Sequence, residues 1–250
     1  MKTYRFAYGS GTVEFPLEEK NIIGELHGNV VEPISDIRRD LWASLDAPID
    51  SAPLCRRVTP GSTVALVVSD MSRFWMRQDL VVPHLVDYLT QRCGVGERDI
   101  TIVIANGTHT GGDEAELRTL VTDAVYDRIT VENHNCESED LVYLGTTPHG
   151  TPVSINRTAA LADMVICLGA ATHHVMAGFG GGRKSILPGI SGRETIFHNH
   201  AFSLDAASLR SNPAVGNGIL QGNPLHEDMC EAAGLVKNLF MVNLVMNTQM

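Results

Sequence analysis

The sequence predicts an α/β fold: a largely parallel sheet flanked by helices, with a small irregular or β lead-in at the N-terminus. Short runs of apolar, β-branched residues at 63–69, 100–105 and 164–168 have the composition of buried strands. Helix signals follow the first two of these runs, and alternating strands and helices are typical of a parallel sheet.

The first two strands each lead into a predicted helix. After 63–69 (TVALVVS) the chain has helical spacing over 80–92, where Pro83 is tolerated only in the first turn because it lacks an amide N–H. After 100–105 (ITIVIA), residues 113–121 predict a second helix, whose early acidic residues favour the positive end of the helix dipole.

Further strands are expected at 129–132, at 141–144 and, close to the end of the sequence, at 239–246 (LFMVNLVM). The third buried strand, 164–168, runs directly into a segment rich in glycine and histidine. This segment combines backbone that can approach an anion with imidazoles and an amine, so it is where we expect function.

These elements suggest three parts. Residues 1–60 are expected to be a lead-in packed on the main domain, and residues 61–236 to be the α/β domain that carries the site. A new buried strand rarely closes a domain, so residues 237–250 are expected to be the first strand of a further, C-terminal domain.

The composition excludes several classes of function. The net charge is −10, from 19 basic and 29 acidic residues, and such a surface repels the phosphate backbone of nucleic acids. No apolar run approaches the roughly 18 residues of a membrane span, and the N-terminus lacks the apolar core of a signal peptide. The five cysteines are scattered without a C-x-x-C pair, which favours reduced thiols, a cytoplasmic location and no zinc–cysteine site.

Polar loops follow the three buried strands: SDMSR at 69–73, NGTH at 106–109, and THHVMAGFGGGRK at 172–184. In open parallel sheets, ligands bind beyond the carboxyl ends of the strands. We therefore expect the three loops to meet at one crevice.

The glycine run AGFGGGRKS (177–185) has the composition of a phosphate cradle, or simply of a flexible loop. It is not a Walker A motif, because Arg183 separates the last glycine from Lys184 and because Pro188 stops a helix within a turn. Lys184 is either an ordinary surface amine or, beside Arg183, an amine with a lowered pKa and increased nucleophilicity.

The histidines of this segment come in two pairs. His198 and His200 share a face if the chain is extended, where both can bind a metal, but they diverge on a helix, where one serves. His173 and His174 are adjacent in an extended segment, so at most one faces a given site.

The two earlier loops carry further candidates. His109 is placed as a general base, or as a turn residue that caps the following helix. Arg73 offers a bidentate fork to a carboxylate or phosphate, or forms a local surface pair with Asp70.

Taken together, these residues resemble the nickel-dependent lactate racemase family, specifically its N-terminal domain. The matching segments occur in the same order and span most of the chain: SDMSR (69–73), ANGTH (105–109), VYLGTTPHGTPVSINR (142–157), HHVMAGFGGGRKSILPGI (173–190) and ETIFHNH (194–200).

The resemblance implies a cofactor, a nickel pincer nucleotide: a pyridinium-3-thioamide-5-thiocarboxylate mononucleotide whose sulfur-containing arms hold nickel. It also implies a role for each matching residue: Lys184 bonds covalently to the cofactor, Asp70, Ser72, Gly181 and Gly182 contact it, His200 binds nickel, His109 and His174 are paired general acid/bases, and Arg73 holds the substrate carboxylate.

The implied activity is racemisation or epimerisation of a small 2-hydroxy acid by reversible hydride transfer to the cofactor. Phe74 and Trp75 follow Arg73 where the family often has proline, so the substrate is lactate or a related, bulkier acid. The resemblance implies that enzymes that synthesise the cofactor act as loading partners. Neither nucleic acid nor a membrane is expected as a partner, and an oligomer is possible. The alternatives are a nucleotide-binding phosphotransferase that uses the glycine loop, and a non-catalytic module that binds a nucleotide or metal.

Overall fold

The computed structural model describes residues 1–29 and 31–246, which form two compact units, Met1–Pro33 and Ile34–Met246. The first unit contains an antiparallel hairpin of β1 (Lys2–Tyr8) and β2 (Gly11–Leu17), followed by a 3₁₀ turn. The hairpin turns at Gly9, whose φ of 58° suits glycine.

The second unit is built on a five-stranded sheet in which every pairing is parallel. The strand order is β13-β8-β3-β4-β5. This confirms the predicted α/β fold with a parallel sheet. The bounds are Val64–Ser69 for β3, Ile100–Ala105 for β4, Thr130–Asn133 for β5, Met164–Ala170 for β8 and Leu239–Leu244 for β13.

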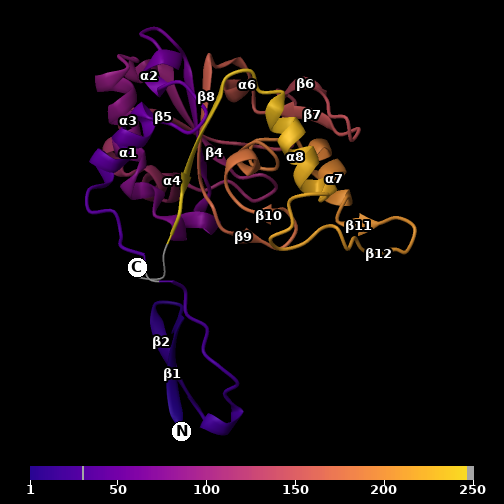
Figure 1. Ribbon diagram of the computed structural model, residues 1–250. Coiled ribbons are helices and arrows are strands. Elements are labelled where there is room, and N and C mark those ends of the chain that lie inside the picture. The colour runs from indigo at the N-terminus through magenta and orange to yellow at the C-terminus, as the bar shows by residue number, and fades with distance from the viewer. Residues whose placement is uncertain (30, 247–250) are drawn as a thin grey trace. The chain divides into compact units, whose positions relative to one another are not determined.

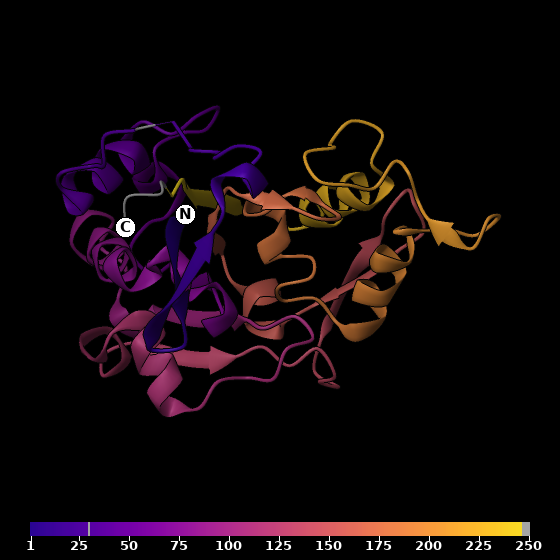
Figure 2. The ribbon, with the colours of Figure 1, turned by 90° about the horizontal axis from the view of Figure 1, so that it is seen from below.

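Helices cover both faces of this sheet, because alternate residues of each buried strand point to opposite sides. Leu66 and Val68 of β3 pack into one core with helices α1–α5, whereas Ala65 and Val67 pack into the other with α6–α8. Figures 1 and 2 show α1 and α3 on one side of the sheet and α7 and α8 on the other.

The first helical layer comprises α1 (Ile37–Asp46), α2 (Leu54–Arg57), α3 (Val82–Asp87), α4 (Glu114–Val121) and α5 (Asp123–Tyr126). The second comprises α6 (Arg157–Leu161), α7 (Arg193–Ala201) and α8 (Pro224–Gly234). The helix expected over 80–92 is divided: α3 carries Pro83 in its first turn, and a π-helical turn, Tyr88–Arg92, completes it.

Smaller strand pairs lie outside the main sheet. The expected strand at 141–144 pairs antiparallel with a neighbour rather than joining the parallel sheet. The pairs are β6 (Val142–Thr146) with β7 (Pro152–Ile155), β9 (His173–His174) with β10 (Gly178–Phe179), and β11 (Leu204–Asp205) with β12 (Arg210–Ser211).

The boundaries of the main unit differ from those expected. Helices α1 and α2 fall within it rather than in a lead-in over 1–60, because Leu41, Leu45 and Leu54 are buried in its core. Strand β13 pairs with β8 and buries Phe240, so 239–244 is a strand of this sheet; residues 247–250 of that segment lie outside the described residues, and a further C-terminal domain stays a prediction. Within the described residues, no helix has the length and apolarity that crossing a membrane requires.

Candidate active site

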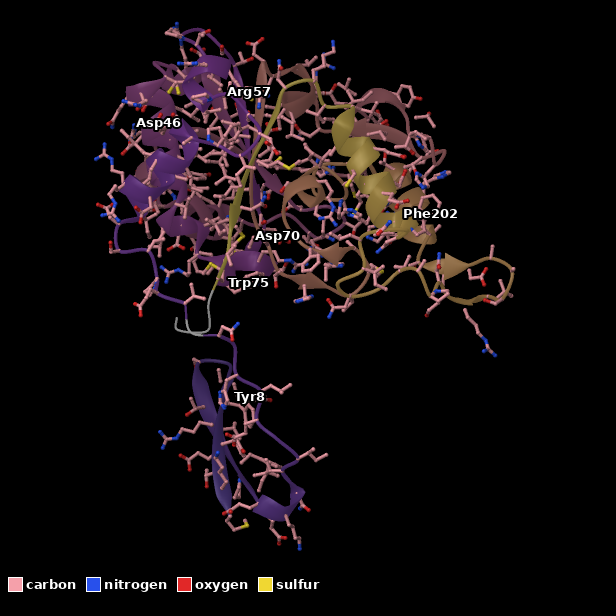
Figure 3. All side chains as sticks on the ribbon, in the orientation of Figure 1. Tyr8, Asp46, Arg57, Asp70, Trp75 and Phe202 are labelled. Atoms are coloured by element: carbon pink, nitrogen blue, oxygen red, sulfur yellow. The ribbon has the colours of Figure 1, made fainter. Side chains whose placement is uncertain are left out.

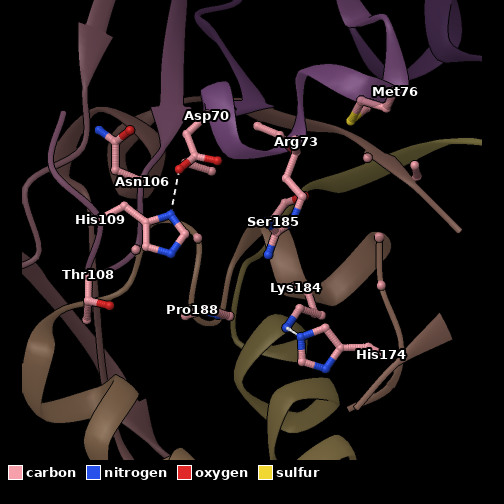
Figure 4. Close-up of a pocket in the computed structure, with 18 of the residues that line it drawn as sticks. Asp70, Arg73, Met76, Asn106, Thr108, His109, His174, Lys184, Ser185 and Pro188 are labelled. Carbon is pink, nitrogen blue, oxygen red and sulfur yellow. Dashed lines mark hydrogen bonds and ion pairs between the residues drawn. The ribbon is translucent and has the colours of Figure 1, made fainter. Parts of the chain in front are cut away.

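A cavity of about 360 Å³ lies at the carboxyl ends of the three central strands. Ser69, Ala105 and Ala170, the last residues of β3, β4 and β8, all line it. The polar loops that follow these strands therefore meet in one crevice, as the strand order requires. Figure 3 labels Asp70 and Trp75, two of the lining residues, and Figure 4 shows the cavity in close-up.

His109 is held by Asp70, a residue of a different loop. Its Nδ1 lies 2.6 Å from Oδ2 of Asp70, which is only 9% exposed. A carboxylate only accepts hydrogen bonds, so Nδ1 carries the proton and Nε2 presents a lone pair. Half of the His109 side chain is exposed. The cap of α4 is Asp113, not His109, so the histidine is not a capping residue.

Ser72 connects the arginine of the first loop to this pair. Its hydroxyl donates to Oδ1 of Asp70 at 2.7 Å and accepts from the guanidinium of Arg73 at 2.9 Å. Within the described part of the chain, Arg73 has no ion pair, so the local pair with Asp70 does not form. Figure 4 shows Arg73 reaching between His109 and His174, with its charge available to a ligand.

His174 and Lys184 lie on the other side of the cavity and contact each other. Nζ of Lys184 is 3.1 Å from Nε2 of His174. Burial, with the positive charge of Lys184 and Arg73, lowers the pKa of His174 to about 4. Burial, together with Arg183 and Arg73, lowers the pKa of Lys184 to about 8.

His173 points elsewhere, as expected for neighbours in an extended segment. It is exposed, donates from Nδ1 to Oδ1 of Asn217 at 2.9 Å, and packs on the ring of Phe179. Only His174 of this pair lines the cavity.

His200 reaches the cavity from helix α7, whereas His198 of the same helix is exposed. Nδ1 of His200 donates to the carbonyl of Ile196 at 2.9 Å, one helical turn earlier, which leaves Nε2 as a lone-pair donor. Burial lowers the pKa of His200. A neutral imidazole oriented in this way is suited to bind a metal.

Helix α7 is fixed by a buried carboxylate on helix α8. Asp228, fully buried, accepts hydrogen bonds from Thr147, Thr151 and Asn199, the last of which directly precedes His200. Its oxygens also lie near His149 and Glu231, within 4.8 Å of one another. Because the Asp228 carboxylate is already saturated by donors, we assign it a structural role rather than metal binding.

The glycine loop is shaped by contacts that exclude side chains. A Cβ at Gly181, where φ is 71°, would lie 2.5 Å from Oδ1 of Asn243 and 2.9 Å from the carbonyl of Ala170. The amide of Gly182 donates to Oδ1 of Asn243 at 2.9 Å, so it is not available to a phosphate, and Gly182 does not line the cavity. Lys184 lies in a 3₁₀ turn, Gly182–Ser185, and no helix follows it.

Two aromatic side chains form an exposed apolar wall. Trp75 and Phe197 both line the cavity and remain exposed, whereas Met76, which also lines it, is buried. Phe74, in contrast, packs against the core that the sheet forms with helices α1–α5. Of the two residues that replace the expected proline, only the tryptophan therefore faces a ligand.

Sequence reasoning brought most of these residues together but missed two. Of the predicted site residues, the cavity is lined by Asp70, Arg73, His109, His174, Gly181, Lys184 and His200, but not by Ser72 or Gly182. Phe197 was missed because helix α7 has no clear apolar face, and Asn243 because it lies on a strand far along the chain. Asp70, for which a cofactor contact stays a prediction, also orients His109.

The fold and the site define a class: a parallel α/β protein with a crevice equipped for proton transfer and for binding a carboxylate. The chain matches the model of the lactate racemase N-terminal domain over residues 8–211. It therefore belongs to the lactate racemase family and contains that family's N-terminal domain.

Relatives of known name agree with this assignment. The chain is 28% identical to a lactate racemase of Thermoanaerobacterium thermosaccharolyticum over 99% of its length, and 28% identical to one of Lactiplantibacillus plantarum over 96%. These matches cover 57% and 55% of the relatives, so the chain spans about half the length of the curated relatives it matches.

Solved structures share the fold. The lactate racemase apoprotein of T. thermosaccharolyticum superposes with a TM-score of 0.82 at 27% identity, over 98% of this chain and 56% of that one. A protein of Thermotoga maritima superposes with a TM-score of 0.66 at 23% identity, over 90% of this chain and 54% of that one, and shows the fold alone.

Proposed function

We propose that this chain is the cofactor-bearing part of a nickel-dependent racemase or epimerase of a small 2-hydroxy acid. One observation carries the proposal: of two histidines in one cavity, one presents an unprotonated Nε2 and the other a protonated Nε2. Nε2 of His109 presents a lone pair because Nδ1 is bonded to Asp70, whereas Nε2 of His174 carries a hydrogen because its Nδ1 accepts backbone amides. One base and one acid are what inversion at a carbinol carbon requires.

The residues present fit a lysine-tethered nickel pincer nucleotide. His200 offers an oriented imidazole nitrogen, Lys184 a buried amine, and Gly181 a surface without a side chain. Imidazole with soft sulfur donors suits a square-planar Ni(II) site. When bound, the cofactor would accept and return the substrate C–H hydrogen as hydride, chemistry that no side chain of this site can supply.

The side chains of this chain would bind the substrate and move its hydroxyl proton. Arg73 holds the carboxylate by a bidentate fork. His109 accepts the hydroxyl proton at Nε2, while Asp70 stabilises the resulting imidazolium, and His174 returns a proton on the opposite face. Asp70 and Ser72 would thereby support proton transfer and arginine placement, in addition to the cofactor contact that the resemblance implies.

The aromatic wall favours a substrate bulkier than lactate. Trp75 and Phe197 leave apolar surface exposed in the cavity, and burying it against an apolar substituent is favourable. We therefore propose a 2-hydroxy acid with an aromatic or branched side chain. Loading by cofactor-synthesis enzymes and a cytoplasmic location belong to the same proposal, as does a second domain that closes the crevice.

The test is to produce the protein together with enzymes that assemble the cofactor, then to measure its intact mass, its Lys184 peptide and its nickel content. We expect an adduct on Lys184 and bound nickel. Lys184→Arg should abolish the adduct. His200→Ala should lose nickel but keep the adduct on Lys184. His198→Ala, a matched change on the same helix, should retain both. Unmodified protein under these conditions would overturn the proposal.

A further inference from the structure

The imidazole of His174 is held in one tautomer by the backbone. Its Nδ1 faces the amides of Met176 and Ala177, at 3.2 and 3.1 Å. Both amides are donors, so Nδ1 must accept, and the hydrogen of the neutral ring lies on Nε2.

This tautomer determines the direction of the hydrogen bond to Lys184. Nε2 of His174 lies 3.1 Å from Nζ, and Nε2–H can only donate. The amine must therefore accept, which requires its lone pair and hence its uncharged form. An ammonium group at Nζ would instead need a bare Nε2, which moves the ring hydrogen to Nδ1 and against the two backbone amides.

The surroundings of Lys184 act in the same direction. Burial, its neighbour Arg183, and Arg73 from the first loop all disfavour a positive charge on its amine. The nearest carboxylate on the cavity lining, Asp70, is already bonded to His109 and Ser72. No carboxylate pairs with Lys184 within the described residues, so nothing stabilises an ammonium ion there.

We propose that His174 is a positioning residue for the unloaded protein: it donates to Lys184 and stabilises the uncharged form of the amine, which is the nucleophile toward an electrophilic acyl or thioacyl carbon once this hydrogen bond opens. In the step, the Nζ lone pair forms the N–C bond, the bond from that carbon to its leaving group breaks with its electron pair, and one amine proton passes to water. That the natural electrophile is an arm of the cofactor rests on the proposed function; the state of the amine does not.

Attachment then changes the role of His174. The nitrogen of an amide or thioamide has a delocalised lone pair and an N–H, so it no longer accepts from Nε2–H. The histidine loses its partner and its hydrogen becomes available to a substrate. Loading therefore both tethers the cofactor and frees His174 to act as an acid. While no cofactor is present, His174 stays hydrogen-bonded to Lys184.

The first test is competitive acetylation of the unloaded protein with trace acetic anhydride across pH, read by peptide mass spectrometry. The chain has four lysines, and exposed Lys237 is an internal reference. We expect Lys184 to reach half-maximal reactivity at about pH 8. His174→Ala should move this midpoint upward and reduce Lys184 labelling at pH 7.5 about tenfold. His174→Gln, which keeps a donor, should restore part of it, and His173→Ala should have no effect.

The second test needs no substitution. In ¹⁵N-histidine NMR spectra of the unloaded protein at pH 8.5, Nε2 of His174 should be protonated and Nδ1 should not. A protonated Nδ1, or a Lys184 midpoint equal to that of Lys237, would overturn the inference even if cofactor attachment occurs. If Lys184 is reactive toward acetic anhydride but acquires no adduct when the cofactor is supplied, the proposed function is refuted and the inference about the amine still holds.

Discussion

Nδ1 of His109 and Oδ2 of Asp70 lie 2.6 Å apart, although the two residues are 39 positions apart in the chain. The contact joins the loop after β3 to the loop after β4, and Ser72 extends it to Arg73. Proton transfer and carboxylate binding are thus supported by one hydrogen-bonded chain of side chains.

Asp70→Asn tests this contact. The asparagine amide would donate to Nδ1, so the ring hydrogen would move to Nε2 and the base would be lost. We expect kcat of the loaded enzyme to fall about 10²- to 10⁴-fold, as for loss of a general base. Chiral chromatography of the product measures the rate. Asp140→Asn, an exposed change, is the control; a near-normal kcat for Asp70→Asn would argue against the assigned tautomer.

Gly181→Ala tests the shape of the lysine loop. The new Cβ would collide with Oδ1 of Asn243 and with the Ala170 carbonyl, at a φ of 71° that alanine resists. We expect a loss of about 1–3 kcal/mol in the free energy of unfolding, measured in urea. Gly234→Ala, at the open end of helix α8, should be neutral or slightly stabilising. Equal stability of the two variants would refute the steric account.

Asp228→Ala removes the acceptor shared by Thr147, Thr151 and Asn199. Three buried donors lose their partner, so we expect destabilisation of about 3 kcal/mol in chemical denaturation. Glu231→Gln, which breaks only a partly exposed pair with His149, should cost less than about 1 kcal/mol. Nickel affinity should fall in the first variant alone, because Asn199 precedes His200 on helix α7.

Stability should depend on pH through His174. Burial lowers its native pKa to about 4, whereas the unfolded chain keeps the ordinary value of 6.5. Between these values the unfolded state binds a proton that the native state does not, so stability is complete above pH 6.5 and declines as pH falls toward 4. Melting temperatures across this range should show a shallower decline in His174→Gln than in His173→Gln; identical slopes would count against the shift.

Substrate preference should depend on the aromatic wall. Trp75→Ala removes apolar surface from the cavity, so kcat/KM for 2-hydroxy-3-phenylpropanoate should fall relative to lactate. A change of about tenfold in this ratio corresponds to a partly buried aromatic contact. Trp42→Phe, a change beside Tyr88 in the first helical layer, should leave the ratio unchanged. A ratio that does not respond to Trp75 would exclude it as a specificity determinant.

The fold was largely predictable because β3, β4 and β8 are short β-branched runs that are buried on both faces. The convergence of Arg73, His109 and Lys184 followed from the same reasoning, since parallel strands end at one edge of the sheet. The pairing of β13 was not predictable, because an edge strand and the first strand of another domain have the same local sequence.

Side-chain partnerships were the other limit. Packing alone fixes the positions on which two of these contacts depend. One joins an oxygen of Asp70 to His109, and the other joins Asn243 to Gly182. The same holds for Cys55 and Cys93, scattered in the sequence, whose Sγ atoms lie 2.7 Å apart. Residue spacing carries no information about such contacts between distant segments.

The bond from Gly182 to Asn243 makes an edge strand part of the lysine loop. Within the described residues, strand β13 is paired on one side only, with β8, as β5 is at the other edge, so it detaches more easily than the three central strands. Any force or partner that peels it away pulls on the backbone two residues before Lys184. The rate of deuterium uptake at the Gly182 amide therefore reports how stably β13 is paired with β8.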